Sequence, residues 1–269
     1  MSITLPNIHP TAIVEDGAKV SNSCKIGPYC CIGPEVTLDH NVSLVSHVVV
    51  SGRTFIGKGT KIWPFSSVGS EPQDLKYNGE KSTLTIGQNN LIRECVSIST
   101  GTDGGGGITS IGNNCLFMLG SHVGHDCKLG DNIIIANNSA IAGHVIIEDN
   151  VNIGGLVGVH QFCRIGEGSM IGAHAMVSKD IIPFSMIVGM RPVLSGVNLV
   201  GLKRRGSKRE DMKKLVDVFS ILFEKKGSQN FQERIEAIDK DELYQITEVQ
   251  KVIKFMKQES NRSYVAPQT

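Results

Sequence analysis

Residues 111–177, IGNNCLFMLGSHVGHDCKLGDNIIIANNSAIAGHVIIEDNVNIGGLVGVHQFCRIGEGSMIGAHAMV, place an apolar side chain at every sixth position. A helix repeats every 3.6 residues and could not keep this phase, so the period predicts short strands separated by turns. The apolar residues at these positions are Ile111, Phe117, Val123, Leu129, Ile135, Ile141, Ile147, Ile153, Val159, Ile165, Ile171 and Val177.

The same period extends toward the N-terminus, with two interruptions. An aliphatic residue stands at every sixth position from Val14 to Val68 and again from Ile86 to Ile98. Glycine often follows it, as frequent tight turns require. A small residue often stands four positions after it, and most of the seven cysteines fall in that slot, so we expect small core residues rather than nucleophiles. The cysteines in this slot are Cys24, Cys30, Cys115, Cys127 and Cys163.

These six-residue units resemble the repeats of the hexapeptide acyltransferases, which fold as a left-handed parallel β-helix. The resemblance implies that three such units form the three sides of one coil. Stacked aliphatic columns would fill the interior, which accounts for an aromatic content of only 5%. We expect a mainly β fold: a left-handed parallel β-helix (hexapeptide-repeat solenoid) over residues 1–190, with loop insertions near 69–85 and 99–109. A small C-terminal α-helical domain is expected at 191–269.

Composition excludes several classes of protein. The 269 residues carry 27 Lys and Arg against 26 Asp and Glu, a net charge of +1 that argues against a general nucleic-acid binder. No C-x-x-C pair supports a zinc ribbon or a thioredoxin-type motif. We see no signal peptide and no apolar run of about 18 residues that could span a membrane, so we expect a cytoplasmic protein without a transmembrane segment.

The two interruptions are candidate functional loops, because breaks in a solenoid often carry function. The first contains Gln73, Asp74 and Lys76 within four residues. The second contains the run Gly104 to Gly107. Four glycines without a following Lys-Ser/Thr make no Walker motif, so we favour a flexible lid or spacer over a phosphate cradle.

The tail has the pattern of a helical domain. A short helix is predicted over residues 198–205, and a capping box at 207–210 would start a second helix that ends before Gly227. Asn230 with Glu233 would start another. Val249, Val252, Ile253 and Met256 mark the last one. Such a domain could cap the exposed strand edges at the end of the solenoid.

Histidines gather in the second repeat block. On coils with three six-residue sides, positions 143 and 161 lie directly beyond His125, so His144 and His160 each stand one residue from its column, and His122 lies one turn earlier. Two chemistries compete for this cluster: three imidazoles can bind Zn²⁺, or one histidine can act as a general base near neutral pH. The first would resemble the hexapeptide-type carbonic anhydrases, which share only the fold.

The motifs around these histidines resemble the UDP-N-acetylglucosamine acyltransferase family over essentially the whole chain. The family moves a (R)-3-hydroxyacyl chain from acyl carrier protein to the 3-hydroxyl of UDP-N-acetylglucosamine, the first step of lipid A biosynthesis. The resemblance implies that His125 is the general base, that Asp126 orients it, and that the Gly143 N–H binds the oxyanion. The matching segments are 73–77, 121–127, 136–138, 142–144, 158–163 and 201–206.

The resemblance also assigns binding residues and partners. His122, His144, His160 and Gln161 match the sugar pocket, and Gln73, Asp74 and Lys76 match a loop that reaches over the substrate. Ala173 matches a position that limits acyl length. No cofactor is implied beyond the phosphopantetheine of the acyl carrier protein donor, and the family is a homotrimer. Asn198, Arg204 and Arg205 match the nucleotide end, and Lys208 with Arg209 extends a basic cluster suited to acidic acyl carrier protein.

The chain departs from the family pattern in its second loop and its tail. Ser99-Thr100 replaces a His-Arg pair, and Val200 stands where several members carry Glu. Three alternatives remain open at this stage. One is a related hexapeptide acyltransferase that acylates the amine of a UDP-amino sugar, another is a histidine–zinc solenoid, and the third is a purely structural solenoid.

Overall fold

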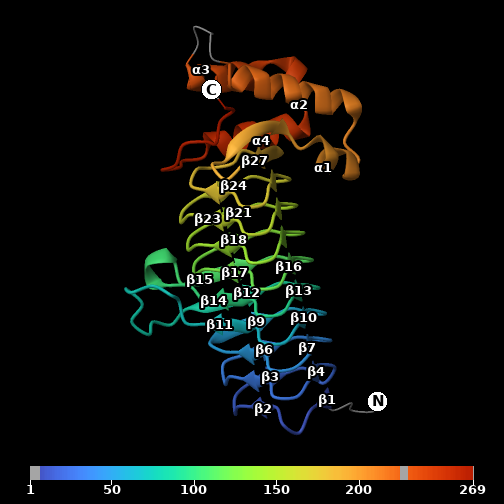
Figure 1. The fold of residues 1–269 in the computed structure, drawn as a ribbon, viewed down its shortest axis with the longest axis vertical. Helices are drawn as coiled ribbons and strands as arrows, with labels where there is room; N and C mark the ends of the chain where they lie inside the picture. Colours follow the sequence, from blue (N-terminus) through green and yellow to red (C-terminus); the bar gives the residue numbers. More distant parts are fainter. Residues whose placement is uncertain (1–6, 225–229, 269) are drawn as a thin grey trace.

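The computed structural model describes residues 7–224 and 230–268, in which consecutive strands fall on the three sides of a left-handed parallel β-helix (Figure 1). The first sheet contains β1 (Asn7–Ile8), β4 (Lys25–Ile26), β7 (Ser43–Leu44), β10 (Lys61–Ile62), β13 (Leu91–Ile92), β16 (Leu116–Phe117), β19 (Ile134–Ile135), β22 (Asn152–Ile153), β25 (Met170–Ile171), β27 (Ser185–Val188) and β28 (Val193–Val197). The second contains β2 (Ile13–Val14), β5 (Cys31–Ile32), β8 (Val49–Val50), β11 (Ser67–Ser70), β14 (Ser97–Ser99), β17 (His122–Val123), β20 (Ala140–Ile141), β23 (Gly158–Val159) and β26 (Met176–Val177). The third contains β3 (Lys19–Val20), β6 (Thr37–Leu38), β9 (Arg53–Ile56), β12 (Thr83–Ile86), β15 (Ile108–Ile111), β18 (Lys128–Leu129), β21 (Ile146–Ile147) and β24 (Arg164–Ile165).

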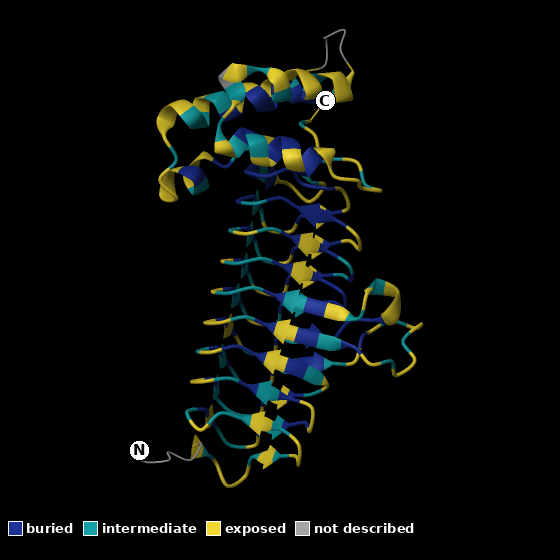
Figure 2. Ribbon diagram, turned by 180° about the vertical axis from the view of Figure 1, so that it is seen from behind, coloured by how far each residue is buried: buried dark blue, intermediate teal, exposed yellow. Residues whose placement is uncertain are grey.

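Strand pairing confirms the predicted coil. Phe117 lies opposite Ile135, and Ile135 lies opposite Ile153, so an uninterrupted coil comprises three six-residue sides. The predicted apolar positions are buried from Ile26 to Val177, and the five cysteines of the small-residue slot are buried with them. Figure 2 shows this interior running the length of the solenoid. Stacked aliphatic side chains therefore supply the apolar contact that larger aromatic residues often provide.

The corners of the prism use left-handed backbone turns. Asn114, Asn132 and Asn150 form one column with φ of 56°, 57° and 60°, and asparagine tolerates this conformation better than most residues. At the corner between the second and third sheets, Asp126 and His144 adopt the same conformation with φ of 59° and 62°. Since corner residues one coil apart stack on one another, this corner brings functional side chains from separate coils together.

Both interruptions leave the solenoid at that same corner. The first connects β11 to β12 and the second connects β14 to β15, with a short 3₁₀ helix, η1 (Asp103–Gly105), in the second. Figure 1 shows the two loops projecting side by side from one edge of the solenoid. The insertions thus lie beside the corner that carries Asp126 and His144.

The helices cover the C-terminal end of the solenoid (Figure 1). The division expected at 190/191 falls between β27 and β28, which pair antiparallel, so the first sheet continues to Val197 before the helices begin. The helices are α1 (Leu199–Arg204), α2 (Arg209–Leu222), α3 (Phe231–Lys240), the 3₁₀ helix η2 (Glu242–Tyr244) and α4 (Thr247–Lys257).

Two of three sequence-based helix starts are confirmed. The Asn198 side chain accepts from the Gly201 N–H at the start of α1, and Asn230 with Glu233 forms a complete capping box on α3. The box predicted at 207–210 is wrong. The Ser207 hydroxyl instead donates to Glu248 at 2.8 Å, and α2 begins at Arg209. The tertiary contact with α4 takes the hydroxyl that a local cap would need. The predicted end before Gly227 lies outside the described residues, and α2 itself ends at Leu222.

A buried ion pair joins the last coil to the helices. Arg164 Nε donates to Asp180 Oδ2 at 2.7 Å, and its guanidinium lies 4.4 Å from the centre of the Phe255 ring on α4.

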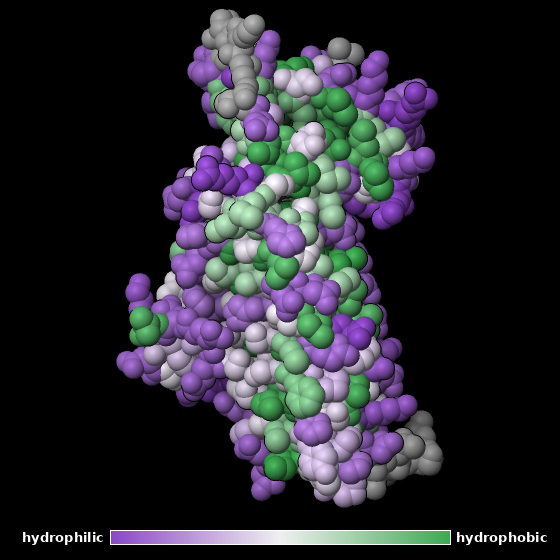
Figure 3. All heavy atoms as spheres, in the orientation of Figure 1, coloured by the Kyte–Doolittle hydropathy of each residue, from purple (hydrophilic) through white to green (hydrophobic). Residues whose placement is uncertain are grey.

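On the outer surface, apolar and weakly polar side chains run in a band along one face, between hydrophilic margins (Figure 3). In the described part of the chain, no helix is long and apolar enough to cross a membrane.

Candidate functional site

The site occupies the corner where β17 turns toward β18. The His125 and His144 rings meet edge to face with their centres 4.9 Å apart, and His144 stacks on Phe162 at 4.4 Å with 5° between the ring planes. Asp126, His144 and Phe162 are the corner residues of three successive coils, all with left-handed φ. Position 143 lies against His125, as the 18-residue coil predicted, and the neighbouring column of Asp126, His144 and Phe162 brings the His144 ring beside His125.

His125 and Asp126 form a hydrogen-bonded pair. Nδ1 of His125 lies 2.7 Å from Oδ2 of Asp126, and the two residues are only 5% and 3% exposed. A neutral imidazole that donates from Nδ1 keeps its lone pair on Nε2. That Nε2 lies 4.0 Å from Asp74 Oδ2 of the first loop. The pair can therefore accept a proton at Nε2 while the Asp126 carboxyl group holds the ring.

The second loop closes directly over Asp126. Oδ1 accepts from the Thr102 N–H at 2.9 Å, and Oδ2 accepts from the Thr102 hydroxyl at 2.6 Å. The Asp126 N–H donates to Thr109 Oγ1 at 2.8 Å. A Cβ at Gly105 would lie 2.0 to 2.4 Å from three atoms of the Asp126 carboxyl group. The glycine run therefore permits close packing on Asp126, where the sequence had suggested a flexible lid or spacer.

Thr102 and Thr109 were missed in the sequence. In the sequence they are simply one threonine on each side of the glycine run, and their spacing matches no known short motif. They contact Asp126 because the chain returns to the same corner one coil later, where β15 pairs with β18.

Gly143 lies against His125 on the next coil. A Cβ at Gly143 would fall 2.6 Å from Cε1 and Nε2 of His125, so only glycine fits there without displacing the imidazole. Within residues 7–224 and 230–268, no protein acceptor bonds the Gly143 N–H. An unengaged N–H next to Nε2 can bind an oxygen that develops negative charge.

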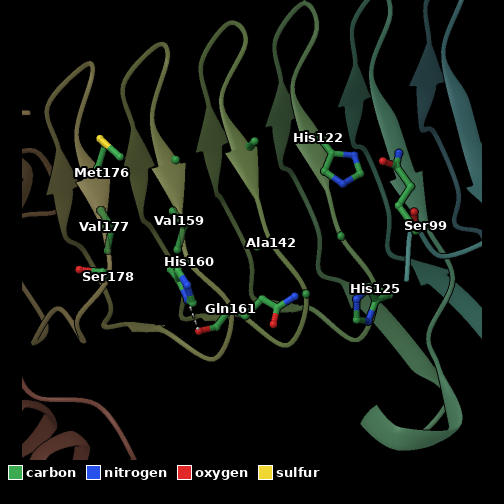
Figure 4. Close-up of a pocket in the computed structure, with 15 residues that line it drawn as sticks. Ser99, His122, His125, Ala142, Val159, His160, Gln161, Met176, Val177 and Ser178 are labelled. Carbon is green, nitrogen blue, oxygen red and sulfur yellow. Dashed lines mark hydrogen bonds between the residues drawn. The ribbon is translucent and has the colours of Figure 1, made fainter. Parts of the chain in front are cut away.

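His125 and Gly143 line a groove of about 540 Å³ that runs along the second sheet (Figure 4). Gln73 of the first loop lines one part of it, and Ser99, a departure from the family pattern, lines the same groove. The other lining residues are His122, Gly124, His125, Ala140, Ala142, Gly143, Gly158, Val159, His160, Gln161, Met176, Val177 and Ser178.

Burial lowers the pKa of two histidines at the site. Burial, followed by repulsion from His125, lowers the pKa of His122, whose Nδ1 lies 2.8 Å from the Ser97 hydroxyl. Burial also lowers the pKa of His144, against the opposing effect of Asp126. Both imidazoles are thereby favoured as neutral hydrogen-bonding groups rather than cations.

Several predicted site residues lie away from the groove in the described single chain. Lys76 is exposed on the first loop, where its N–H donates to Asp74 Oδ1 at 3.0 Å. Ala173 is exposed at the corner between the first and second sheets. Asn198 is buried, and its amide bonds Gly168 O and caps α1. Arg204 and Arg205 are exposed on the tail.

The alternative of a metal site was tested on His125, Asp126 and His144, whose potential ligand atoms lie within 4.8 Å of one another. Two donations from Thr102 and one from His125 already occupy the Asp126 oxygens, and Nδ1 of His125 is committed to the same carboxyl group. A metal would have to displace these bonds. The set fits an oriented histidine better than a coordination sphere.

Matches to known families agree with this geometry. Residues 108–143 and 144–179 match the bacterial transferase hexapeptide (six repeats), and residues 180–265 match domain 2 of UDP N-acetylglucosamine O-acyltransferase. The fold and site thus define a hexapeptide-repeat acyltransferase with a helical C-terminal region.

The particular family follows from whole-chain similarity. The chain is 44% identical over 267 residues to the acyl-[acyl-carrier-protein]–UDP-N-acetylglucosamine O-acyltransferase of Sinorhizobium fredii, covering 99% of this chain and 98% of the relative. The enzyme of the same name from Paracoccus denitrificans is 50% identical over 77% of each chain. LpxA from Acinetobacter baumannii superposes with a TM-score of 0.92 at 41% identity, covering 96% of this chain and 99% of that one. The chain belongs to the acyl-[acyl-carrier-protein]–UDP-N-acetylglucosamine O-acyltransferase family, as its motifs indicated.

Proposed function

We propose that the chain transfers a (R)-3-hydroxyacyl group from acyl carrier protein to the 3-hydroxyl of UDP-N-acetylglucosamine, the first step of lipid A biosynthesis, with His125 as general base. The observation that carries the mechanism is the buried His125–Asp126 pair, whose Nε2 lies beside the unengaged Gly143 N–H. Family membership supports the substrates.

In this mechanism His125 Nε2 removes the proton of the 3-hydroxyl as its oxygen attacks the thioester carbonyl. The Asp126 carboxyl group stabilises the imidazolium that forms, and the Gly143 N–H binds the oxyanion of the tetrahedral intermediate. Collapse of the intermediate breaks the carbon–sulfur bond. His125 returns the proton to the departing phosphopantetheine thiolate, so the reaction consumes no cofactor.

The groove would hold the sugar between groups on successive coils. His122, His144, His160 and Gln161 offer hydrogen-bond donors and acceptors for the hydroxyl and N-acetyl groups. Gln73 and Asp74 would contact the sugar from the first loop, where Asp74 already lies 4.0 Å from His125. Lys76 would reach the substrate from that loop as a flexible cation.

A homotrimer would complete the site. The groove is open, whereas Asn198, Arg204, Arg205 and Ala173 lie elsewhere on the same chain. A neighbouring copy would bring its nucleotide-binding and acyl-limiting residues to this groove, as closed cyclic symmetry allows. Ala173 would then limit the length of the acyl chain. The partners are thus UDP-N-acetylglucosamine, acyl carrier protein and two further copies, without nucleic acid or a required metal.

Product analysis tests the proposed function. Purified protein is incubated with UDP-N-acetylglucosamine or its 3-amino analogue and a panel of (R)-3-hydroxyacyl carrier proteins, and products are identified by mass spectrometry. The expected product is the 3-O-acyl ester of UDP-N-acetylglucosamine. Acylation of the 3-amino analogue alone, giving an amide, would overturn the assignment of the acceptor, and no acylation of either would overturn the reaction.

A further inference from the structure

The C-terminal segment 260–265 runs back along the last coil toward the groove. The Asp180 N–H donates to Ser263 O at 2.9 Å, and the Val265 N–H donates to Asp180 O at 2.8 Å. The Ser260 hydroxyl donates to Asp180 Oδ2 at 2.7 Å. Three bonds to one buried residue therefore fix this segment against the solenoid, and Arg262 lies between them.

Arg262 reaches the edge of the groove. Its Nη2 lies 2.8 Å from His160 Nδ1 and 2.7 Å from Gln161 O, and its Nη1 lies 3.2 Å from Ser178 O. All three partners belong to residues that line the groove. His160 and Arg262 are 102 residues apart in the sequence.

These contacts determine which nitrogen of His160 carries hydrogen. A guanidinium group donates hydrogen bonds and has no lone pair to accept one, so Nδ1 must present its own lone pair to Arg262. The alternative is donation from Nδ1 to Gln161 O, the dashed line in Figure 4, which is longer at 3.3 Å. That oxygen already accepts from Arg262. The neutral ring therefore carries its hydrogen on Nε2.

We propose that Arg262 is a positioning residue that holds His160 in the Nε2–H tautomer, so that the groove offers an N–H donor to an oxygen of the bound acceptor. The role in acceptor binding rests on the proposed function, whereas the tautomer does not. The helical region thereby contributes to the groove of its own chain through its last segment. An acceptor oxygen of a hydroxyl, carbonyl or phosphate group satisfies this donor.

The tautomer is measured directly on the free protein. Long-range ¹H–¹⁵N spectra of histidine-labelled protein, with the His160 signals assigned by His160→Gln, report which nitrogen is protonated. We expect Nε2–H in the wild type. In Arg262→Ala we expect a shift toward Nδ1–H, because Gln161 O becomes free to accept. Arg262→Lys keeps a donor and should retain part of the Nε2–H population. Asn261→Ala changes an exposed neighbour on the same segment and should leave the spectrum unchanged.

Binding and kinetics then test the positioning role. Losing one neutral hydrogen bond should raise the Kd and KM for UDP-N-acetylglucosamine about 3- to 10-fold in Arg262→Ala, with kcat and the KM for the acyl carrier protein donor nearly unchanged. The increase should be smaller in Arg262→Lys. Thermal unfolding checks that both variants remain folded.

Two results overturn the proposal. A wild-type His160 that carries hydrogen on Nδ1 contradicts the tautomer, whatever the activity. A tautomer that shifts in Arg262→Ala without any change in Kd contradicts the positioning role. If the tautomer behaves as expected but the wild type forms no acylated UDP-N-acetylglucosamine, the proposed function fails, and with it the assigned role in acceptor binding, whereas the tautomer assignment stands.

Discussion

Adding one methyl group at Gly105 should misplace Asp126. The new Cβ would lie 2.0 Å from Asp126 Cγ, whereas van der Waals contact between carbons needs about 3.5 Å, so the loop or the carboxyl group must move by roughly 1.5 Å. That movement breaks or lengthens the Thr102 bonds of 2.6 and 2.9 Å. Losing one hydrogen bond to a charged group costs about 1.5–3 kcal/mol.

Gly104 provides the matched control, because a Cβ there meets nothing within 4 Å and neither glycine has a positive φ. Since a displacement of about 1 Å in a catalytic group can cost 10²-fold, we expect Gly105→Ala to lower kcat by roughly 10- to 100-fold, with Gly104→Ala within about twofold of wild type. Initial rates of UDP-N-acetylglucosamine acylation are measured at saturating substrates, with Tm alongside. Equal rates and equal Tm for the two variants would refute the packing of this loop on Asp126.

Three further outcomes follow from the structure. Burial lowers the pKa of His122 and His144 below the ordinary value of 6.5. Because the unfolded chain therefore takes up protons at a higher pH than the folded chain, the free energy of unfolding should be highest above pH 6.5 and should decrease as the pH falls below 6.5. Urea unfolding from about pH 7.5 to 5.5 measures this slope, and His144→Asn should flatten it; an unchanged slope counts against the shift. Exhaustive chelation should leave acyl transfer intact, and a loss restored by zinc would favour the metal alternative. Arg164→Met leaves Asp180 buried without its cation and should cost about 3–5 kcal/mol of unfolding free energy, which a urea midpoint equal to wild type would contradict.

The solenoid was accessible from sequence because its interactions repeat at a fixed spacing. Once each coil has three six-residue sides, Ile135 and Ile153 must stack, and His125 and His144 must approach each other. The coil length places position 143 on His125, whereas the side chains that stack beside that column are set at the corner, where Asp126 and His144 adopt left-handed φ. Periodicity alone carries no information about that choice.

Contacts without a period could not be predicted. The packing of Gly105 on Asp126 depends on the path of an irregular loop, and a glycine run is compatible with either mobility or close approach. Ser207 has the sequence of a helix cap, yet Glu248 takes its hydroxyl through tertiary packing. Arg262 reaches His160 only because the helical region folds back over the last coil.

The rate of His125→Asn tests the central claim most directly. Asparagine keeps a polar side chain at this position but cannot act as a base at neutral pH. If His125 is the general base, kcat for acyl transfer to UDP-N-acetylglucosamine should fall by about 10²–10⁴, with both KM values and the Tm close to wild type. A kcat within about threefold of wild type in a folded variant would contradict general-base catalysis by His125.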